Sequence, residues 1–282
     1  MTSRQIGERL QTELIHNVAL RVEPTADPDI FAVSGRGELH LGILLETMRR
    51  EGYEVAVSRP HVIVKTIDGE ECEPWEELSV DVESGHQGAV MEALGERGGS
   101  LEAMEPDGRG RVRLQYNIPA RGLIGFQTEF MTLTSGSGLI YHVFDRYAPM
   151  AGSQISNRRN GALISSTTGK ALAYALWNLQ ERGRLFIHPN TDVYEGQIIG
   201  LHARDNDLTV NPLKGKQLTN IRASGKDVSI ILEPPLRLTL ERAIELIDDD
   251  ELVEITPESI RVRKKHLKEH ERKSASRAKK YA

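Results

Sequence analysis

The order in which strand and helix periodicities follow one another is the sequence feature that most restricts how this chain can fold. Between residues 75 and 147 the hydrophobic pattern runs strand, helix, strand, strand, helix, strand. Apolar and polar residues alternate over 78–82, and apolar residues recur at helical spacing over 87–97. A Pro-Asp-Gly turn then separates two further alternating runs, which predicts a hairpin. This segment therefore has a complete split βαββαβ pattern.

The first seventy residues show the same order with one strand fewer. Five predicted elements follow one another as helix, strand, strand, helix and strand: 4–16, 18–22, 30–33, 41–51 and 55–64. A βαββαβ unit requires a strand before its first helix. We therefore interpret the chain as a fragment of a longer protein.

The pattern changes again from residue 151. Helices are predicted over 171–182 and 239–247. Short β-like segments lie at 185–187, 197–202, 228–232, 252–255 and 260–262. The polar stretch 211–227 has neither period and is long for a structureless loop inside a compact domain, so it is either functional or disordered.

Together these patterns predict an α+β protein with two ferredoxin-like βαββαβ units, the first lacking its initial strand, followed by a β-rich C-terminal domain with helices. The predicted domains are 1–70, 71–150 and 151–282. A chain of 282 residues, 39% of them hydrophobic, is long enough to bury more than one core. The single cysteine, Cys72, rules out an internal disulfide. With no bilayer-length apolar run and no signal-peptide pattern, a soluble cytosolic protein is expected.

Charge is unevenly distributed along the chain. The net charge is −5, but residues 259–282 hold ten Lys or Arg against two Glu, so this tail carries +8 and the remainder −13. A basic tail of this kind indicates a polyanionic partner. A solvated, disordered end is the alternative that charge alone leaves open.

Three short motifs are similar to nucleotide-binding sequences but lack residues that phosphate binding requires. Ser34–Leu41 (SGRGELHL) has His40 where the dinucleotide fingerprint needs a third small residue, which predicts a strand-to-helix turn. Thr168-Gly169-Lys170 lacks the earlier glycine and the following hydroxyl of a P-loop. The segment 107–110 matches the GTPase D-x-x-G pattern but lies between two predicted strands, as a hairpin turn does. No catalytic residue, bound cofactor or nucleotide hydrolysis is expected in this chain.

The sequence offers little for a metal ion. The acidic run Asp248–Glu251 is not followed by the glycine turn and spaced carboxylates of a calcium loop, which favours a solvated helix end. Histidines such as His40, His142 and His202 are interpreted as isolated structural residues, because no cysteine pairing accompanies them. No metal site is expected.

The strongest candidate for a binding site is the polar stretch 211–227. Its spaced cations and small polar residues suit an irregular phosphate surface, because proteins recognise RNA largely through its shape and backbone. A merely solvated loop is the alternative. The predicted RNA-binding residues are Lys214, Lys216, Asn220, Arg222 and Lys226 in this stretch, Arg158 and Arg159 before it, and Arg261, Arg263, Lys264 and Lys265 in the tail.

Longer stretches of the chain are similar to a known family. Ser34–Leu41 resembles the G-x-G-E-L-H-L turn in the third domain of elongation-factor-G-like translational GTPases. The stretches GLIGFQTEFMTLTSGSG, VYEGQIIGLHARDNDLTVN, KGKQLTNIRASGKD and IDDDELVEITPESIRVRKKHL resemble the BipA/TypA family. The last three resemble a C-terminal domain that elongation factor G does not have. The resemblance covers essentially the whole chain and equates 1–70 and 71–150 with domains III and V of elongation factor G.

The resemblance implies a factor that binds the ribosome where elongation factor G binds, and that serves large-subunit assembly, translation and growth in the cold or under other stress. The implied partners are the 70S ribosome, its 23S rRNA, A-site tRNA and ribosomal proteins, for a monomer that is cytoplasmic and ribosome-associated. Residues 211–227 would reach the acceptor end of A-site tRNA. The family carries a GTPase domain and a β-barrel domain upstream, so GTP and Mg²⁺ belong to the parent protein and not to this chain.

Two other function classes stay open at this point. A small-molecule-sensing regulatory protein is one, since paired ferredoxin-like domains also bind metabolites. An RNA-modifying enzyme is the other, because catalytic sets need not be visible in a sequence. Co-sedimentation with ribosomes separates the ribosome-bound factor from the sensor, and a ligand-dependent melting shift favours the sensor.

Overall fold

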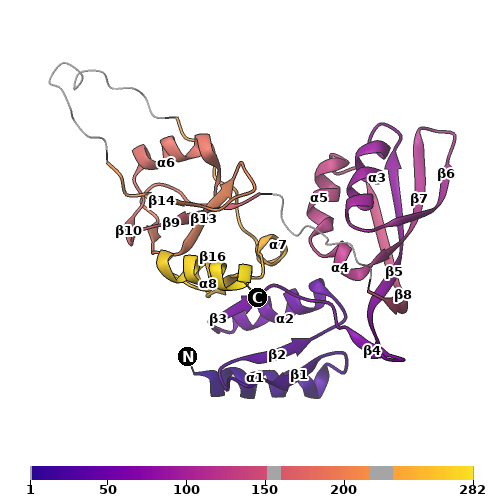
Figure 1. Ribbon diagram of the computed structural model, residues 1–282, viewed down its shortest axis with the longest axis horizontal. Helices are drawn as coiled ribbons and strands as arrows, with labels where there is room; N and C mark the ends of the chain where they lie inside the picture. Colours follow the sequence, from indigo (N-terminus) through magenta and orange to yellow (C-terminus); the bar gives the residue numbers. More distant parts are fainter. Residues whose placement is uncertain (1, 151–159, 216–230, 282) are drawn as a thin grey trace. The chain divides into compact units, whose positions relative to one another are not determined.

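The structure is a computed structural model that describes residues 2–150, 160–215 and 231–281. Internal contacts divide the chain into two compact units, residues 60–157 and residues 1–59 together with 158–282. The predicted α+β class is confirmed, because both units combine mostly antiparallel sheets with helices (Figure 1). Among the described residues, every helix is too short or too polar to cross a membrane.

The described residues of the unit 60–157 form one antiparallel sheet that carries helices. Strands β8, β5, β7 and β6 are neighbours in that order, and β4 pairs with the beginning of β5. The strands are β4 (Lys65–Ile67), β5 (Glu70–Glu83), β6 (Ser100–Pro106), β7 (Arg111–Pro119) and β8 (Leu139–Pro149). The helices are α3 (Gln87–Glu96), α4 (Ala120–Leu123) and α5 (Phe126–Leu133). The predicted second helix is divided in two at Gly125, whose φ of 71° a side chain would disfavour.

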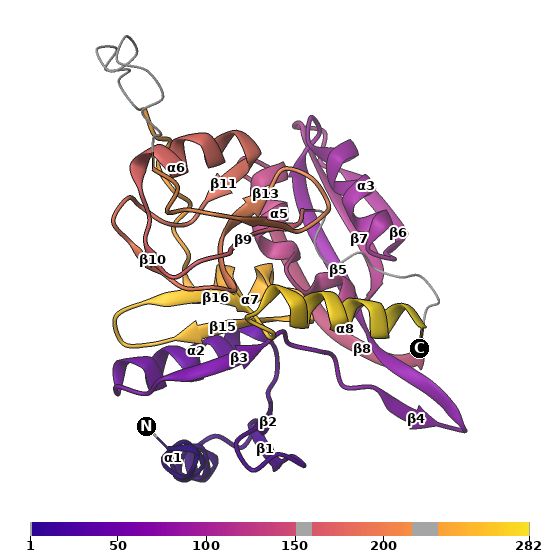
Figure 2. The same cartoon turned by 60° about the vertical axis from the view of Figure 1, so that its left-hand side comes forward.

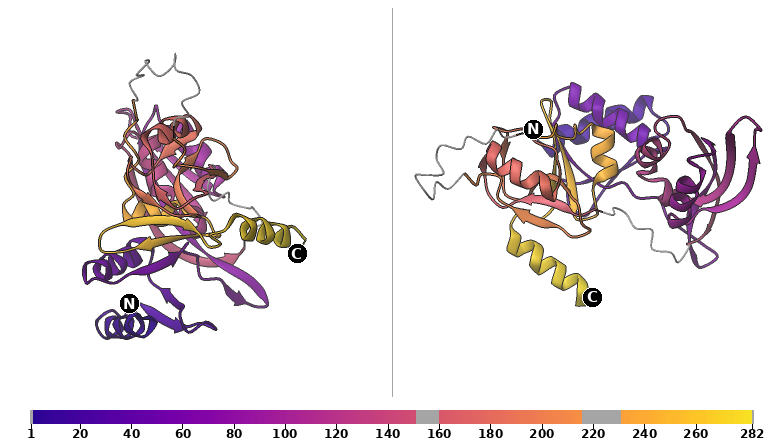
Figure 3. Two further views of the ribbon diagram at one scale, coloured as in Figure 1. Left: turned by 90° about the vertical axis from the view of Figure 1, so that its left-hand side faces the viewer. Right: turned by 90° about the horizontal axis from the view of Figure 1, so that it is seen from above.

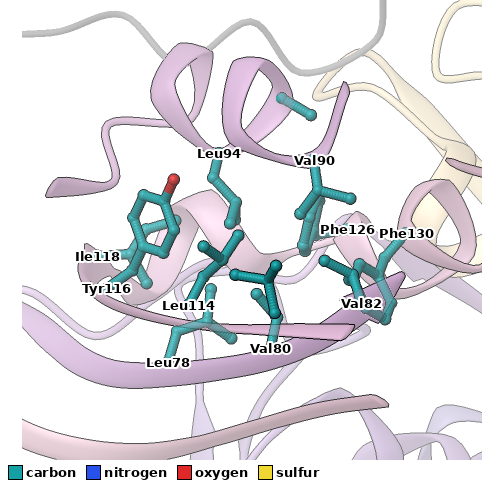
Figure 4. Close-up of a cluster of buried hydrophobic side chains, with 12 residues drawn as sticks. Leu78, Val80, Val82, Val90, Leu94, Leu114, Tyr116, Ile118, Phe126 and Phe130 are labelled. Atoms are coloured by element: carbon teal, nitrogen blue, oxygen red, sulfur yellow. The ribbon is translucent and has the colours of Figure 1, made fainter. Parts of the chain in front are cut away.

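The core of this unit follows from the alternation of β5 and β7. Ten buried side chains from two strands and two helices face one another in Figure 4: Leu78, Val80, Val82, Val90, Leu94, Leu114, Tyr116, Ile118, Phe126 and Phe130. The ring centroids of Phe126 and Phe130 are 5.8 Å apart. Burying one large apolar side chain contributes about 1.5–3 kcal/mol, so this cluster holds α3 and α5 on the sheet.

The other unit contains a seven-stranded sheet. Its strands lie in the order β14, β9, β13, β16, β15, β3, and β11 pairs with β13. The strands of residues 158–282 are β9 (Ala162–Ser165), β11 (Gly183–Leu185), β13 (Gln197–His202), β14 (Leu208–Val210), β15 (Glu251–Ile255) and β16 (Ile260–Lys264), with β10 (Gly169–Lys170) and β12 (Asp192–Val193) forming a separate pair. The helices are α6 (Ala173–Leu179), the 3-10 turn η1 (Gln180–Arg182), α7 (Leu240–Leu246) and α8 (Glu269–Tyr281).

Two apolar clusters use opposite faces of this sheet. Successive residues of a strand point to opposite faces, so Ile198 of β13 joins one cluster and Ile199 joins the other. Helix α7 covers the first cluster with Leu240 and Ile244. Helix α6 covers the second with Leu176. The sheet is therefore buried on both sides at its centre.

The N-terminal residues form helix α1 (Ser3–His16), a hairpin of β1 (Arg21–Pro24) and β2 (Phe31–Ser34), helix α2 (Glu38–Arg50) and strand β3 (Val55–Ser58). A capping box of Thr2 and Gln5 begins α1, which satisfies backbone amides that have no partner within the helix. The buried hydrophobic side chains here are few: Leu10, Leu20, Leu44 and Met48.

Strand β3 pairs with a strand from the C-terminal part of the chain. The βαββαβ pattern predicted it as the last strand of the first unit and specified no partner for it, and its residues lie antiparallel to β15, with Val57 opposite Val253 (Figure 2). The complete unit shows the reason, because there the last strand, β8, pairs with the first strand, β5. Among the described residues no strand precedes α1, so β3 has no equivalent of β5 to pair with. It pairs with the edge of β15 instead.

Other expectations about elements met mixed outcomes. The predicted β-like segment 228–232 lies partly outside the described residues, and its described end, 231–232, is not a strand. The basic tail contains a helix, α8, that follows β16 (Figure 3). Strand β9 had not been predicted, because all four of its residues are buried and show no alternation, and the three-residue strand β14 had not been predicted either.

Candidate nucleic-acid interface

Strand β16 displays the first basic residues of the tail in alternation. Ile260 and Val262 point into the cluster under α7, so Arg261 and Arg263 lie on the opposite face. The Arg263 guanidinium is 2.7 Å from a carboxylate oxygen of Glu254, on the neighbouring strand β15. Arg261 is partly exposed, and Lys265 beyond the strand is exposed. Of these, Arg261 and Lys265 are the better placed to meet an external anion.

Lys264 corrects the predicted RNA-binding set. It shares the inward face with Val262 and lies opposite Glu251 in the strand pairing. Its ammonium is 2.6 Å from Asp207, 3.0 Å from Asp250 and 2.9 Å from Glu251, and the residue is only 2% exposed. Lys264 therefore cannot reach a phosphate, and its positive charge is already neutralised.

The charge state of this cluster follows from two opposed effects. Burial by itself lowers the pKa of the Lys264 amine, because it removes water from the charged form. The nearby carboxylates of Glu251, Asp207 and Asp250 outweigh burial, so the pKa lies above its ordinary value. Lys264 is thus a buried cation that links the end of β16 to Asp207 and to the start of β15 at Asp250 and Glu251.

The acidic run Asp248–Glu251 supplies two of the carboxylates that contact Lys264. Glu251 is fully buried rather than solvated, and it also accepts a hydrogen bond of 3.0 Å from the Asp248 amide. The interpretation of the whole run as a solvated helix end is therefore wrong for Glu251. In the part of the chain that the structure describes, the acids, histidines and Cys72 form no group able to hold a metal ion.

The predicted loop is attached at both ends of helix α6. On its N-terminal side the Leu172 amide donates to the Pro212 carbonyl, 2.9 Å away. On its C-terminal side the Gln180 side chain bonds to the Ile231 carbonyl and the Glu233 amide, each at 3.1 Å. Lys214 is exposed just beyond the first attachment. The predicted residues Lys216, Asn220, Arg222, Lys226, Arg158 and Arg159 lie outside the described residues.

Helix α8 continues the basic character of the tail. Lys273 is 2.6 Å from Glu269 one turn earlier, and Arg272 donates to the His266 and Leu267 carbonyls at the start of the helix. Lys268 and Arg277 are exposed. The tail therefore presents cations on an ordered element and not only on an extended end.

The motifs set aside as nucleotide sites have structural roles. His40 Nδ1 accepts from the Arg36 amide at 3.2 Å, and a side chain at Gly35 would lie 2.6 Å from that nitrogen, so SGRGELHL is a turn fitted around its histidine. Gly169 and Lys170 form strand β10. The Asp107 carboxylate accepts from the Arg109 and Arg111 amides, which lowers its pKa and closes the hairpin turn.

Sequence reasoning missed a pocket of about 420 Å³ beside β16. Arg261 lines it together with His188 and Arg237. These residues come from three segments whose proximity depends on the fold, and neither His188 nor Arg237 belongs to a periodic or repeated pattern. No signal in the sequence points to this grouping.

Comparison with known proteins gives two family matches. Residues 70–158 match the family described as elongation factor G C-terminus, and residues 160–269 match the TypA/BipA C-terminal domain. Three similar proteins are each named large ribosomal subunit assembly factor BipA. The one from Haemophilus influenzae is 65% identical over 98% of this chain and 45% of its own length, the one from Escherichia coli K12 62% over 99% and 46%, and the one from Buchnera aphidicola 58% over 99% and 46%. The chain spans about half the length of these curated relatives.

Proposed function

Because this chain belongs to the BipA/TypA family, we propose that it is the ribosome-binding part of a translational GTPase that acts in assembly of the large ribosomal subunit. Its partners are 23S rRNA, A-site tRNA and ribosomal proteins of the 70S ribosome, and it works in the cytoplasm as a monomer. We further propose that GTP and Mg²⁺ bind elsewhere in the parent protein, and that the parent serves translation and adaptation to cold or stress.

The observation that carries this proposal is the placement of the loop flanks. Hydrogen bonds from Leu172 and Gln180 fix both flanks at the two ends of α6, a helix packed on the central sheet. A loop held in this way has a defined point of departure, where the exposed Lys214 already lies. Cations on a loop that leaves a rigid scaffold are suited to contacting an irregular phosphate backbone.

The tail adds a second set of cations on the same unit. Lys265 and Lys268 follow β16, and Arg277 lies on α8. Binding to RNA phosphates releases counterions from the nucleic acid, so each such contact favours association most strongly at low salt. The positive charge of the loop and tail therefore favours contact between this part of the chain and ribosomal RNA, although the net charge of the whole chain is negative.

The test is a variant in which Lys214, Lys216, Arg222 and Lys226 are all replaced by alanine. Log affinity for ribosomes plotted against log salt should become flatter by roughly 3 units, at about 0.7–0.9 per lost phosphate contact. The melting temperature should stay unchanged, since exposed polar residues contribute little to stability. Affinity is measured by co-sedimentation at several salt concentrations.

A matched control removes four exposed cations that belong to neither the loop nor the tail: Arg4, Arg21, Arg109 and Arg184. It changes the net charge equally, so general electrostatic attraction is held constant between the two variants. The control should keep the salt slope of the parent chain. If both variants show the same slope, the loop is not the contact, and the tail beginning at Arg261 becomes the site to test.

A further inference from the structure

The pocket beside β16 lies where the central strands separate. Strand β13 pairs with β16 only at Gln197 and Ile198, and from Gly200 onward it pairs with β11 instead. The segment 235–238 crosses the resulting gap, where the Leu236 amide donates to the Leu185 carbonyl at 2.7 Å. The gap is left as a partly open pocket of about 420 Å³, a volume within the range of small-molecule sites.

One part of the pocket wall is apolar and includes flat side chains. Ile198 contributes from β13, Phe186 from the position that follows β11, and Pro235 and Leu238 from the crossing segment. Phe186 and Leu238 also pack against the buried cluster under α7, so their positions are fixed by the core. An aromatic ring and a proline ring on a rigid wall suit a planar, weakly polar ligand group.

The other part of the wall is cationic. Arg237 and Arg261 supply this charge, His188 also lines the pocket, and the lining residues, all of them described, include no Asp or Glu. Glu254 is the cross-strand neighbour of Arg261, but its carboxylate is engaged elsewhere: Arg263 lies 2.7 Å from one oxygen and the Tyr194 hydroxyl 2.5 Å from the other. The positive charge of Arg237 and Arg261 is therefore available to an incoming anion.

Polar groups lie between these two parts. Gln197 is 3% exposed, and its side-chain oxygen accepts from the Tyr194 amide at 3.2 Å, which holds the side chain in place at the pocket. Thr191 and Ser259 add hydroxyl groups to the lining. The pocket thus combines a ring-shaped apolar surface, fixed hydrogen-bonding groups and two arginines.

We propose that this pocket binds a nucleoside phosphate, with the base against Phe186 and Pro235 and the phosphate on Arg237 and Arg261. The ligand has two possible sources, a free nucleotide or one unstacked nucleotide of an RNA. Binding of an RNA nucleotide rests on the proposed function and extends it, because it makes β16 an RNA contact that is separate from the loop. Binding of a free nucleotide would make the unit a nucleotide sensor as well.

The experiment uses the full chain with three probes: adenosine monophosphate, inorganic phosphate and a fluorescent single-stranded adenosine hexamer RNA. Arg237→Gln combined with Arg261→Gln is compared with Arg184→Gln combined with Arg204→Gln, two exposed cations of the same unit that do not line the pocket. The pocket variant should weaken binding of the mononucleotide or the RNA at least about tenfold, because hydrogen bonds to charged groups are lost. The control pair should bind as the parent does.

Competition separates the two sources. Displacement of the RNA by excess adenosine monophosphate shows that an RNA nucleotide enters the pocket. Pocket-dependent binding of adenosine monophosphate alone assigns the site to free nucleotides.

Three outcomes would overturn the proposal: neither nucleotide probe binds, both arginine pairs lose affinity equally, or inorganic phosphate binds as tightly as adenosine monophosphate. These failures leave the proposed function intact if the pocket variant still co-sediments with ribosomes. Loss of co-sedimentation in the loop variant, with pocket binding retained, supports the proposed function and the pocket independently.

Discussion

At the residue scale, Lys264 shows how position along a strand decides what a charge does. Ile260, Val262 and Lys264 have the same parity in β16, so all three face the core. Grouping Arg261 to Lys265 by charge alone overlooked this alternation, which was visible in the sequence. The carboxylate of Asp207 could not be anticipated in the same way, because it comes from a separate segment that only the folded sheet brings to Lys264.

We expect Lys264→Met to lower the free energy of unfolding by about 3–5 kcal/mol, since it leaves the fully buried Glu251 without its cation. Lys265→Met, one residue further and exposed, should change it by less than about 0.5 kcal/mol. Urea denaturation of the two variants and the parent measures both effects. Adding Glu251→Gln to Lys264→Met should recover part of the loss. Equal stability of the two lysine variants would contradict a structural role for Lys264.

At the element scale, local signals and long-range pairings differ in how far the sequence determines them. The turn at Gly35 and the hairpin closed by Asp107 were predicted correctly, because each depends on residues close together in the chain. The partner of β3 could not be predicted, because a strand pattern specifies which face is buried and not which neighbouring strand pairs with its edge. Likewise the pocket at Arg261 depends on where β13 and β16 diverge.

Hydrogen exchange should distinguish β3 from the hairpin that precedes it. We expect amides of β3 to exchange about as slowly as those of β15, because they share a seven-stranded sheet. Amides of β1 and β2 should exchange faster, since an isolated two-stranded sheet is only marginally stable. Peptide-level mass spectrometry can compare them, with β5 and β7 as a slow internal reference. Rapid exchange over 55–58, matching 21–34, would argue against the β3–β15 pairing.

At the scale of the whole molecule, the two compact units have separate apolar cores. One of these units carries the exposed Lys214 at the flank of the loop and the exposed Lys265, Lys268 and Arg277 in the tail. The motifs closest to phosphate-binding loops form a helix-entry turn, a strand and a hairpin.

The purified chain is therefore expected not to hydrolyse GTP, because the segments most similar to phosphate loops form turns and strands. A phosphate-release assay checks this expectation. The control is a mock preparation from cells without the gene, which accounts for contaminating GTPases. GTP turnover above that background would show a nucleotide site that these motifs do not explain.

The pairing of β3 with β15 cannot form until most of the chain has been synthesised. Val57 and its partner Val253 are separated by about 196 residues of chain, which synthesis at 5–20 residues per second takes roughly 10–40 s to complete. Through that interval the edge of β3 has no strand beside it, although residues 60–157 can already fold as a unit. An unpaired strand edge is a site for wrong association. The nascent chain is therefore most open to wrong association in the period between synthesis of residues 60–157 and synthesis of the β15–β16 hairpin.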